Sequence, residues 1–210
     1  MLLVFLVFFP FLGAFACLAA GSRSEAARDY LADLITIIEF VMTIILLIGE
    51  GGSGAAALSE GRYAVTAAIG GLCDFGLSFC ADGFRLLYIC IAALMWMMTT
   101  ILSREYFVHH GNRSRFYFFL LLTLGATMGV FLSAELSTTF IFFEIMSFTS
   151  YVWVAQEENT AALRAADTYL AVAVLGGMVM LMGVFLLYHE LGTLEIRALL
   201  PAAQLCEHKS

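Results

Sequence analysis

Charged residues are scarce in this sequence. Only 13% of its 210 residues are Asp, Glu, Lys or Arg, while 62% are hydrophobic and the mean hydropathy is +0.94. Soluble domains carry about 25% charged and about 45–50% apolar residues, so the composition excludes a soluble globular domain. It also excludes a disordered chain, because disorder requires low hydrophobicity and high charge.

Basic residues are the scarcer of the two charges. Ten Lys and Arg stand against 17 Asp and Glu, a formal net charge of −7, and Lys209 is the one lysine. This balance argues against a nucleic-acid partner, since nucleic acids attract basic surfaces. Cysteine and histidine are few and scattered, without the spacing of zinc or iron–sulfur ligands, and there is no GxGxxG motif. We therefore expect no metal site, cofactor or catalytic residue.

Long hydrophobic runs are what the sequence has in abundance. A helix needs about 18 or more apolar residues to cross the hydrocarbon core, whereas barrel strands would be alternating segments of about ten. The first run lacks the basic start of a signal peptide, so we interpret it as a retained span. The pattern predicts an all-α polytopic membrane protein with about six transmembrane helices, over residues 2–20, 31–48, 84–102, 116–133, 136–155 and 167–188.

The loops predict an orientation and a division of the chain. Arg residues are more frequent in the loops after the first, third and fifth spans, so the positive-inside rule places the N-terminus outside the cell membrane. We expect helices 1–2 in residues 1–48, an outer-face loop with a short helix or hairpin in 49–83, helices 3–6 in 84–190 and a polar C-terminal stub in 191–210. Within the outer loop, Cys73 and Cys80 could form a disulfide, although two free thiols are the simpler expectation.

Glu144 is the ionisable residue that stands out. It lies nine residues from Glu135 and thirteen from Glu157, which places it near the bilayer centre, where a charge costs at least about 2.5–3.5 kcal/mol. Helical spacing puts Ser147 and Tyr151 on the same face of the helix as Glu144, together with Ser137 and Phe140 in the preceding turns. Such a polar face suits a carboxylate that takes up and releases protons; the alternative is a protonated hydrogen-bond anchor between helices.

Other polar residues near the spans are accessory candidates. Glu39 lies within the second span and is either interfacial, partner-facing or a second intramembrane carboxylate, and Asp33 is expected at the membrane edge. Arg164 and Asp167 have the i,i+3 spacing of an ion pair on one helix face. Gly176 and Gly177 would allow another helix to approach closely. Asp82 is expected to cap the start of the third span.

Three stretches carry a resemblance to a known family. They are CADGFRLLYICIAALMWMMTTILSREYF at 80–107, TTFIFFEIMSFTSYVWVA at 138–155 and ENTAALRAADTYLAVAVLGGMVMLMGVFLLY at 158–188. These stretches resemble the third, fifth and sixth spans of the proton-conducting antiporter-like subunits of complex I, membrane-bound hydrogenases and Mrp-type Na⁺/H⁺ antiporters. The mid-span Glu is the most specific feature. The resemblance covers most of the chain and is best over residues 80–190.

The resemblance implies a role for Glu144. In this family the fifth-span Glu pairs with a Lys of the seventh span and helps to move protons, and a basic residue such as Arg164 often precedes the sixth span. Family members have about fourteen spans, whereas this sequence has no intramembrane Lys and ends after its sixth run. We therefore expect the N-terminal part of a truncated or split member, whose tail resembles the loop before the missing helix.

The leading functional hypothesis is a proton-translocating subunit, or an N-terminal fragment of one. It would belong to a complex of the NADH:quinone oxidoreductase or hydrogenase type in the inner (plasma) membrane. The partners would be other membrane subunits, the lipid bilayer and protons, with Na⁺ as an alternative coupling ion. The alternatives are an Mrp-type Na⁺/H⁺ antiporter subunit and a non-conducting scaffold or assembly subunit. A membrane enzyme is disfavoured because all four histidines lie outside the spans.

Overall fold

The computed structural model describes residues 2–57, 65–69, 76–107 and 112–207. These residues form one two-stranded hairpin, β1 (Val65–Ile69) and β2 (Leu77–Ala81), and seven helices. The helices are α1 (Leu2–Gly21), α2 (Glu25–Ala57), α3 (Gly83–Tyr106), α4 (Arg113–Leu132), α5 (Leu136–Val154), α6 (Thr160–Leu191) and α7 (Ile196–Glu207). The all-α polytopic fold predicted from the sequence is confirmed.

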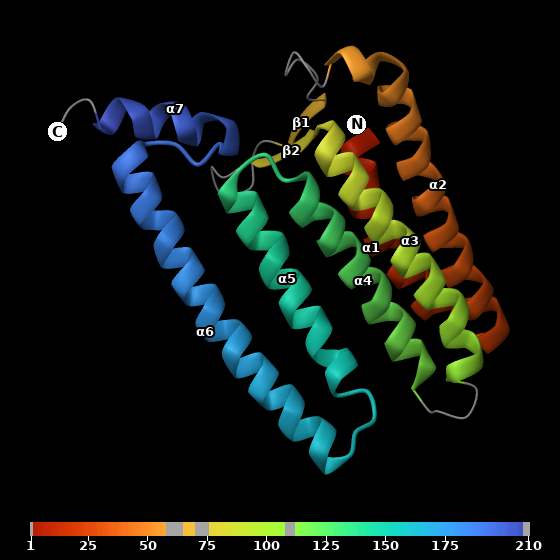
Figure 1. The fold of residues 1–210 in the computed structure, drawn as a ribbon. Helices are drawn as coiled ribbons and strands as arrows, with labels where there is room; N and C mark the ends of the chain where they lie inside the picture. The colour runs from red at the N-terminus through yellow and green to blue at the C-terminus, as the bar shows by residue number, and fades with distance from the viewer. Residues whose placement is uncertain (1, 58–64, 70–75, 108–111, 208–210) are drawn as a thin grey trace.

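Six long helices run up and down, in the order of the predicted spans (Figure 1). α1 to α4 form a bundle, α5 lies against α4, and α6 lies beside α5 at the edge of the molecule (Figure 1). The two chain ends and the β-hairpin lie at one end of the helices, and the α1–α2 and α5–α6 turns lie at the other. α7 crosses the end of α6 and does not continue its direction (Figure 1).

Five of the six predicted spans are long and apolar enough to cross a membrane: α1, residues Glu25–Ile48 of α2, α3, α4 and α6. The fifth predicted span, α5, is 19 residues long but contains the sequence STT at its start and SFTS after Glu144. Polar residues lower its hydropathy, and its place between α4 and α6 shields it from lipid on two sides. The more polar helix is thus the one with protein neighbours on both sides.

The region between the second and third spans differs in part from the expected loop. α2 continues to Ala57, so the helix occupies the first residues of the predicted loop, and β1 and β2 then pair antiparallel with Val65 opposite Ala81. Cys80 is a buried free thiol on β2, whereas Cys73 lies outside the described residues. At the other end of the chain, the expected polar stub contains helix α7, with Pro201 inside it.

Arg85 and Asp82 join the hairpin to the helices. The Asp82 carboxylate caps α3 by accepting from the backbone N–H of Arg85 at 2.9 Å, as its position predicted. The Arg85 guanidinium in turn donates to the carbonyls of Cys80 and Ser133. β2, the start of α3 and the α4–α5 turn are therefore held together at one end of the bundle.

α4 is the centre of the packing. Most of its residues between Phe116 and Leu132 are buried, and its glycines allow close contacts. A Cβ on Gly125 would lie 2.5 Å from the ring of Phe11, and one on Gly129 would overlap the ring of Phe142. α1 and α5 thus insert aromatic rings directly against the backbone of α4.

Candidate functional site

Glu144 lies on the side of α5 that faces α6. A Cβ added to Gly177 would overlap Oε1 of Glu144 and lie 2.7 Å from its carboxyl carbon. The carboxyl group therefore fills the space that any larger residue at Gly177 would need. Gly177 is one of three buried residues of α6, with Ala166 and Val184, so this contact lies in the α5–α6 interface.

The Glu144 carboxyl has few polar neighbours. Its Oε1 is buried and has no hydrogen-bond partner among the described residues. The Ser147 hydroxyl, predicted to share this face, donates to the carbonyl of Phe143 at 2.9 Å and not to Glu144. Tyr151 is half-buried one turn farther on. A buried charge without a partner is costly, so a charged Glu144 requires a cation or water beside it.

Arg164 and Asp167 do not form the expected ion pair. Both side chains are exposed near the start of α6, and no salt bridge joins either of them to another described residue. They are also remote from Glu144, because Gly177, against which Glu144 packs, lies ten residues beyond Asp167, or about 15 Å along a helix. A Cβ added to Gly176, the residue before Gly177, would meet nothing within 4 Å in the described chain.

The Glu39 side chain is buried within the protein and does not reach its surface. Its side chain is 0% exposed and both carboxyl oxygens lack a hydrogen-bond partner within the described residues. It is on α2, which packs against α1 and α3, away from the α5–α6 interface that holds Glu144. Glu39 and Glu144 therefore lie in separate places in the structure.

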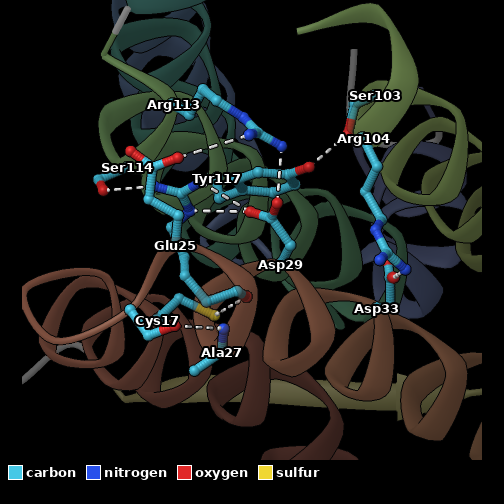
Figure 2. A network of polar contacts seen from close by, with 12 residues as sticks. Cys17, Glu25, Ala27, Asp29, Asp33, Ser103, Arg104, Arg113, Ser114 and Tyr117 are labelled. Carbon is cyan, nitrogen blue, oxygen red and sulfur yellow. Dashed lines mark hydrogen bonds and ion pairs between the residues drawn. The ribbon is translucent and has the colours of Figure 1, made fainter. Parts of the chain in front are cut away.

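A network of buried charges lies near the turn between α1 and α2 (Figure 2). Arg28, only 2% exposed, donates to Asp29 at 2.8 Å and to the Ser114 hydroxyl at 2.8 Å. Asp29 also pairs with Arg113 of α4 at 2.6 Å. The Tyr117 ring lies beneath the Arg28 guanidinium, 5.4 Å from ring centre to Cζ. These contacts tie α2 to α4.

A second ion pair joins α2 to α3. Arg104 donates to Oδ2 of Asp33 at 2.9 Å, and its guanidinium lies 4.4 Å from the centre of the Tyr30 ring. Asp33 is 8% exposed, so its side chain is buried between the helices. Sequence reasoning missed the Asp29–Arg113 and Asp33–Arg104 pairs, and that Glu144 is what packs on Gly177, because these partners are far apart in sequence. The spacing of polar residues along α2 was the signal that could have shown its buried side.

No three His, Cys, Asp or Glu side chains gather as metal ligands within the described ranges. The chemistry that the site offers is that of single buried carboxyl groups. Such a group can bind a proton or face a cation.

Comparisons with known proteins agree with this picture. The sequence profile of a family described as "NADH:quinone oxidoreductase/Mrp antiporter, TM" matches residues 133–209, which include α5, α6 and α7. A putative antiporter subunit mnhD2 of Staphylococcus epidermidis is 28% identical over 196 residues, 90% of this chain. Residues 133–209 are therefore similar to this family, and most of the chain is similar to an antiporter subunit. The S. epidermidis relative is longer, and the chain covers 37% of its length.

A second relative and two solved structures are also similar to this chain. The mnhD2 subunit of Staphylococcus saprophyticus is 33% identical over 124 residues, which is 58% of this chain and 24% of that protein. Among solved structures, one chain of an archaeal membrane-bound sulfane sulfur reductase superposes with a TM-score of 0.81, with 19% identity, over 94% of this chain and 39% of that chain. One chain of the Mrp complex from Dietzia gives a TM-score of 0.79, with 13% identity, over 95% of this chain and 21% of that chain. These two superpositions show the shared fold.

Proposed function

We propose that this antiporter-like chain translocates protons, and that Glu144 is the group that binds and releases them. The observation that carries the proposal is the position of its carboxyl, in the middle of α5 and against the backbone of Gly177. An ionisable group at this depth is expensive to insert, so a functional role is the default interpretation. Oε1 has no hydrogen bond within the described chain that would make it a structural anchor.

Proton movement follows from the electrostatics of such a group. A cation that approaches Glu144 favours the charged carboxylate, which releases its proton; when the cation moves away, the carboxylate takes a proton again. α6 exposes Val172, Val179 and Met182, which lie on the side of the helix opposite Gly177. The cation would come from another segment or subunit, since no described Arg or His forms an ion pair with Glu144.

The complex would be a multisubunit assembly in the inner (plasma) membrane. The names of the staphylococcal relatives favour an Mrp-type Na⁺/H⁺ antiporter. A respiratory complex of the NADH:quinone oxidoreductase or hydrogenase type is the second candidate, favoured by the superposition on a respiratory membrane complex. Proton uptake driven by added Na⁺ supports the antiporter; proton movement driven by electron donors supports the respiratory complex.

The distribution of arginines predicts the orientation of the protein in the membrane. Arg23, Arg104, Arg113, Arg115 and Arg164 all lie at or near the helix ends opposite the chain termini, a side that we call the Arg-rich face. By the positive-inside rule this face is cytoplasmic and the N-terminus is outside. Tags placed on either face and tested with a membrane-impermeant label would check this.

The test of the function is Glu144→Gln in the intact complex. We expect proton transport into membrane vesicles to fall about 100-fold, the lower end of what a positioned proton-transfer group contributes. Assembly of the complex should be unchanged, because the amide has the size of the carboxyl. The matched control is Glu157→Gln, at an exposed position just after α5. Unchanged transport in Glu144→Gln would favour a non-conducting scaffold subunit.

A further inference from the structure

α2 has its polar residues inside and its apolar residues outside. Asp29, Asp33, Thr36, Glu39 and Thr43 are all buried, between 0% and 8% exposed. At 3.6 residues per turn they fall within about a third of the helix circumference. The opposite side exposes large apolar side chains, namely Leu34, Ile37, Ile38, Val41 and Ile45. This is the pattern of a helix that faces lipid on one side and lines a polar strip within the protein on the other.

At the Arg-rich face, the carboxylate of the polar strip is paired with arginines. Farther along α2, carboxyl oxygens of the strip lack partners. Asp29 is paired with both Arg28 and Arg113. Asp33, one turn farther, has Oδ2 paired with Arg104 while its buried Oδ1 has no partner in the described chain. Glu39 has two buried oxygens without a partner among the same residues. The number of available donors thus falls with depth into the membrane.

Glu39 lies near the middle of the membrane. It is fourteen residues from Glu25, the first residue of α2, and nine from Ile48, the end of its candidate span. With 1.5 Å per residue, it is about 20 Å from the start of the helix. Burial of an unpaired carboxylate at that depth is costly, so a proton is the simplest partner for the two free oxygens.

Few other ionisable groups surround Glu39. Among the described residues, α1 offers only Cys17, which contacts the Arg28 carbonyl, and α4 offers Tyr117, Arg113 and Arg115 at the Arg-rich face. α3 runs antiparallel to α2 and has Arg104 opposite Asp33, with Thr100 one turn deeper and 0% exposed. The remaining ionisable groups of α3 are Arg85, Tyr88, Cys90, Glu105 and Tyr106, toward its ends or outer side.

Thr36 lies between the two carboxyl groups whose oxygens lack hydrogen-bond partners. It lies three residues after Asp33 and three before Glu39, and its hydroxyl donates to the Asp33 carbonyl at 3.0 Å. A hydroxyl that donates once can still accept a hydrogen bond. Asp33 and Glu39 are six residues apart, about 9 Å along the axis, so Thr36 and water between them would complete the path.

We propose that Glu39 is a second proton-binding site within the membrane, separate from Glu144, which exchanges its proton with the Arg-rich face by way of Asp33 and Thr36. A proton from water at that face passes to Oδ1 of Asp33 and then, through the Thr36 hydroxyl and water, to a Glu39 oxygen, which becomes a neutral carboxyl. Release follows the same route in reverse. Only the contribution of this site to transport rests on the proposed function of Glu144.

The test is infrared difference spectroscopy on the complete complex in lipid vesicles after a pH jump at the Arg-rich face. A protonated carboxyl has a C=O band that a carboxylate lacks. We expect a pH-dependent carboxyl band that is absent from Glu39→Gln and retained in Glu144→Gln. Asp33→Asn should leave the final size of this band unchanged but slow its appearance severalfold.

The outcomes separate this proposal from the other one. Loss of the band in Glu144→Gln alone would assign it to Glu144 and overturn the Glu39 site. A Glu39 band that does not respond to pH at either face would indicate a permanently protonated anchor and would also overturn it. Removal of the band by Na⁺ at constant pH would mean that the site binds a cation and not a proton. An unimpaired band in Glu39→Gln would leave Glu39 without a role even if proton transport through Glu144 is established.

Discussion

The α1–α4 bundle and the α5–α6 pair bury their carboxylates in different ways. In the bundle, Asp29 and Asp33 are matched with arginines from neighbouring helices. In the pair, Glu144 packs against Gly177 and has no cation within the described residues. This contrast indicates that the charges near the Arg-rich face hold helices together. Under the proposed function, Glu39 and Glu144 remain available for a proton or for an outside cation.

The two regions also differ in packing. α4 is buried along most of its length, whereas α6 buries only Ala166, Gly177 and Val184 and exposes most of its apolar side chains. A region with few buried contacts opens at lower cost than a packed core. We therefore expect substitutions in the bundle to change stability and substitutions in the pair to change transport.

The largest effect on stability is expected for Arg28→Ala. Leaving a buried charge without any partner typically costs about 3–5 kcal/mol, so the loss in this variant should lie below that range. Asp29 would keep Arg113, while the Ser114 hydroxyl would lose its donor. Thermal unfolding of the purified complex in detergent would measure the change. Arg164→Ala, at an exposed position, is the control and should unfold like the wild type; equal behaviour of the two variants would contradict the anchoring role.

Gly177→Ala should affect transport and leave stability nearly unchanged. The added methyl would overlap Oε1 of Glu144, so the carboxyl must move away from the α6 backbone. A displacement of about 1 Å in a reacting group can reduce a rate about 100-fold. Proton transport in vesicles would measure it. Gly176→Ala, where a Cβ meets open space, is the matched control; a similar loss in both variants would argue for a general helix effect.

Asp33→Asn should destabilise the bundle only slightly. Its partner Arg104 is 35% exposed, and partly exposed ion pairs contribute about 0–1 kcal/mol. The asparagine oxygen can still accept from Arg104. Thermal unfolding alongside Arg28→Ala would test this order. A larger loss in Asp33→Asn than in Arg28→Ala would mean that α2 is held mainly by α3 and not by α4.

The smallest effect concerns Cys80 in the hairpin. Burial raises the pKa of its thiol, outweighing the nearby Arg197 and Arg85, which lower it. A raised pKa leaves less of the reactive thiolate at neutral pH. Alkylation of Cys80 should therefore be slow at neutral pH and accelerate only above the ordinary thiol range, which mass spectrometry of labelled peptides would follow. Fast labelling at neutral pH would show that the hairpin leaves the bundle readily.

The long helices could be predicted from local sequence. Hydrophobic runs identify spans because lipid requires every backbone group to bond within a helix. The Asp82 cap is equally local, since its carboxyl accepts from a residue three positions on. The ends of α2 and the helix α7 were missed, because neither the glycine-rich end of α2 nor the short, Pro201-containing α7 has the length and apolarity of a span.

The amino-acid order alone is enough to specify the number and order of the long helices and the presence of two carboxyl groups deep within them. Which ionisable groups meet depends instead on how the helices pack. Asp33 and Arg104 are 71 residues apart, and Glu144 and Gly177 are 33 apart. Each pair forms because particular faces of two helices come together. Helix formation depends on residues that are neighbours in sequence. The partner of a buried charge depends instead on how helices that are distant in sequence pack together.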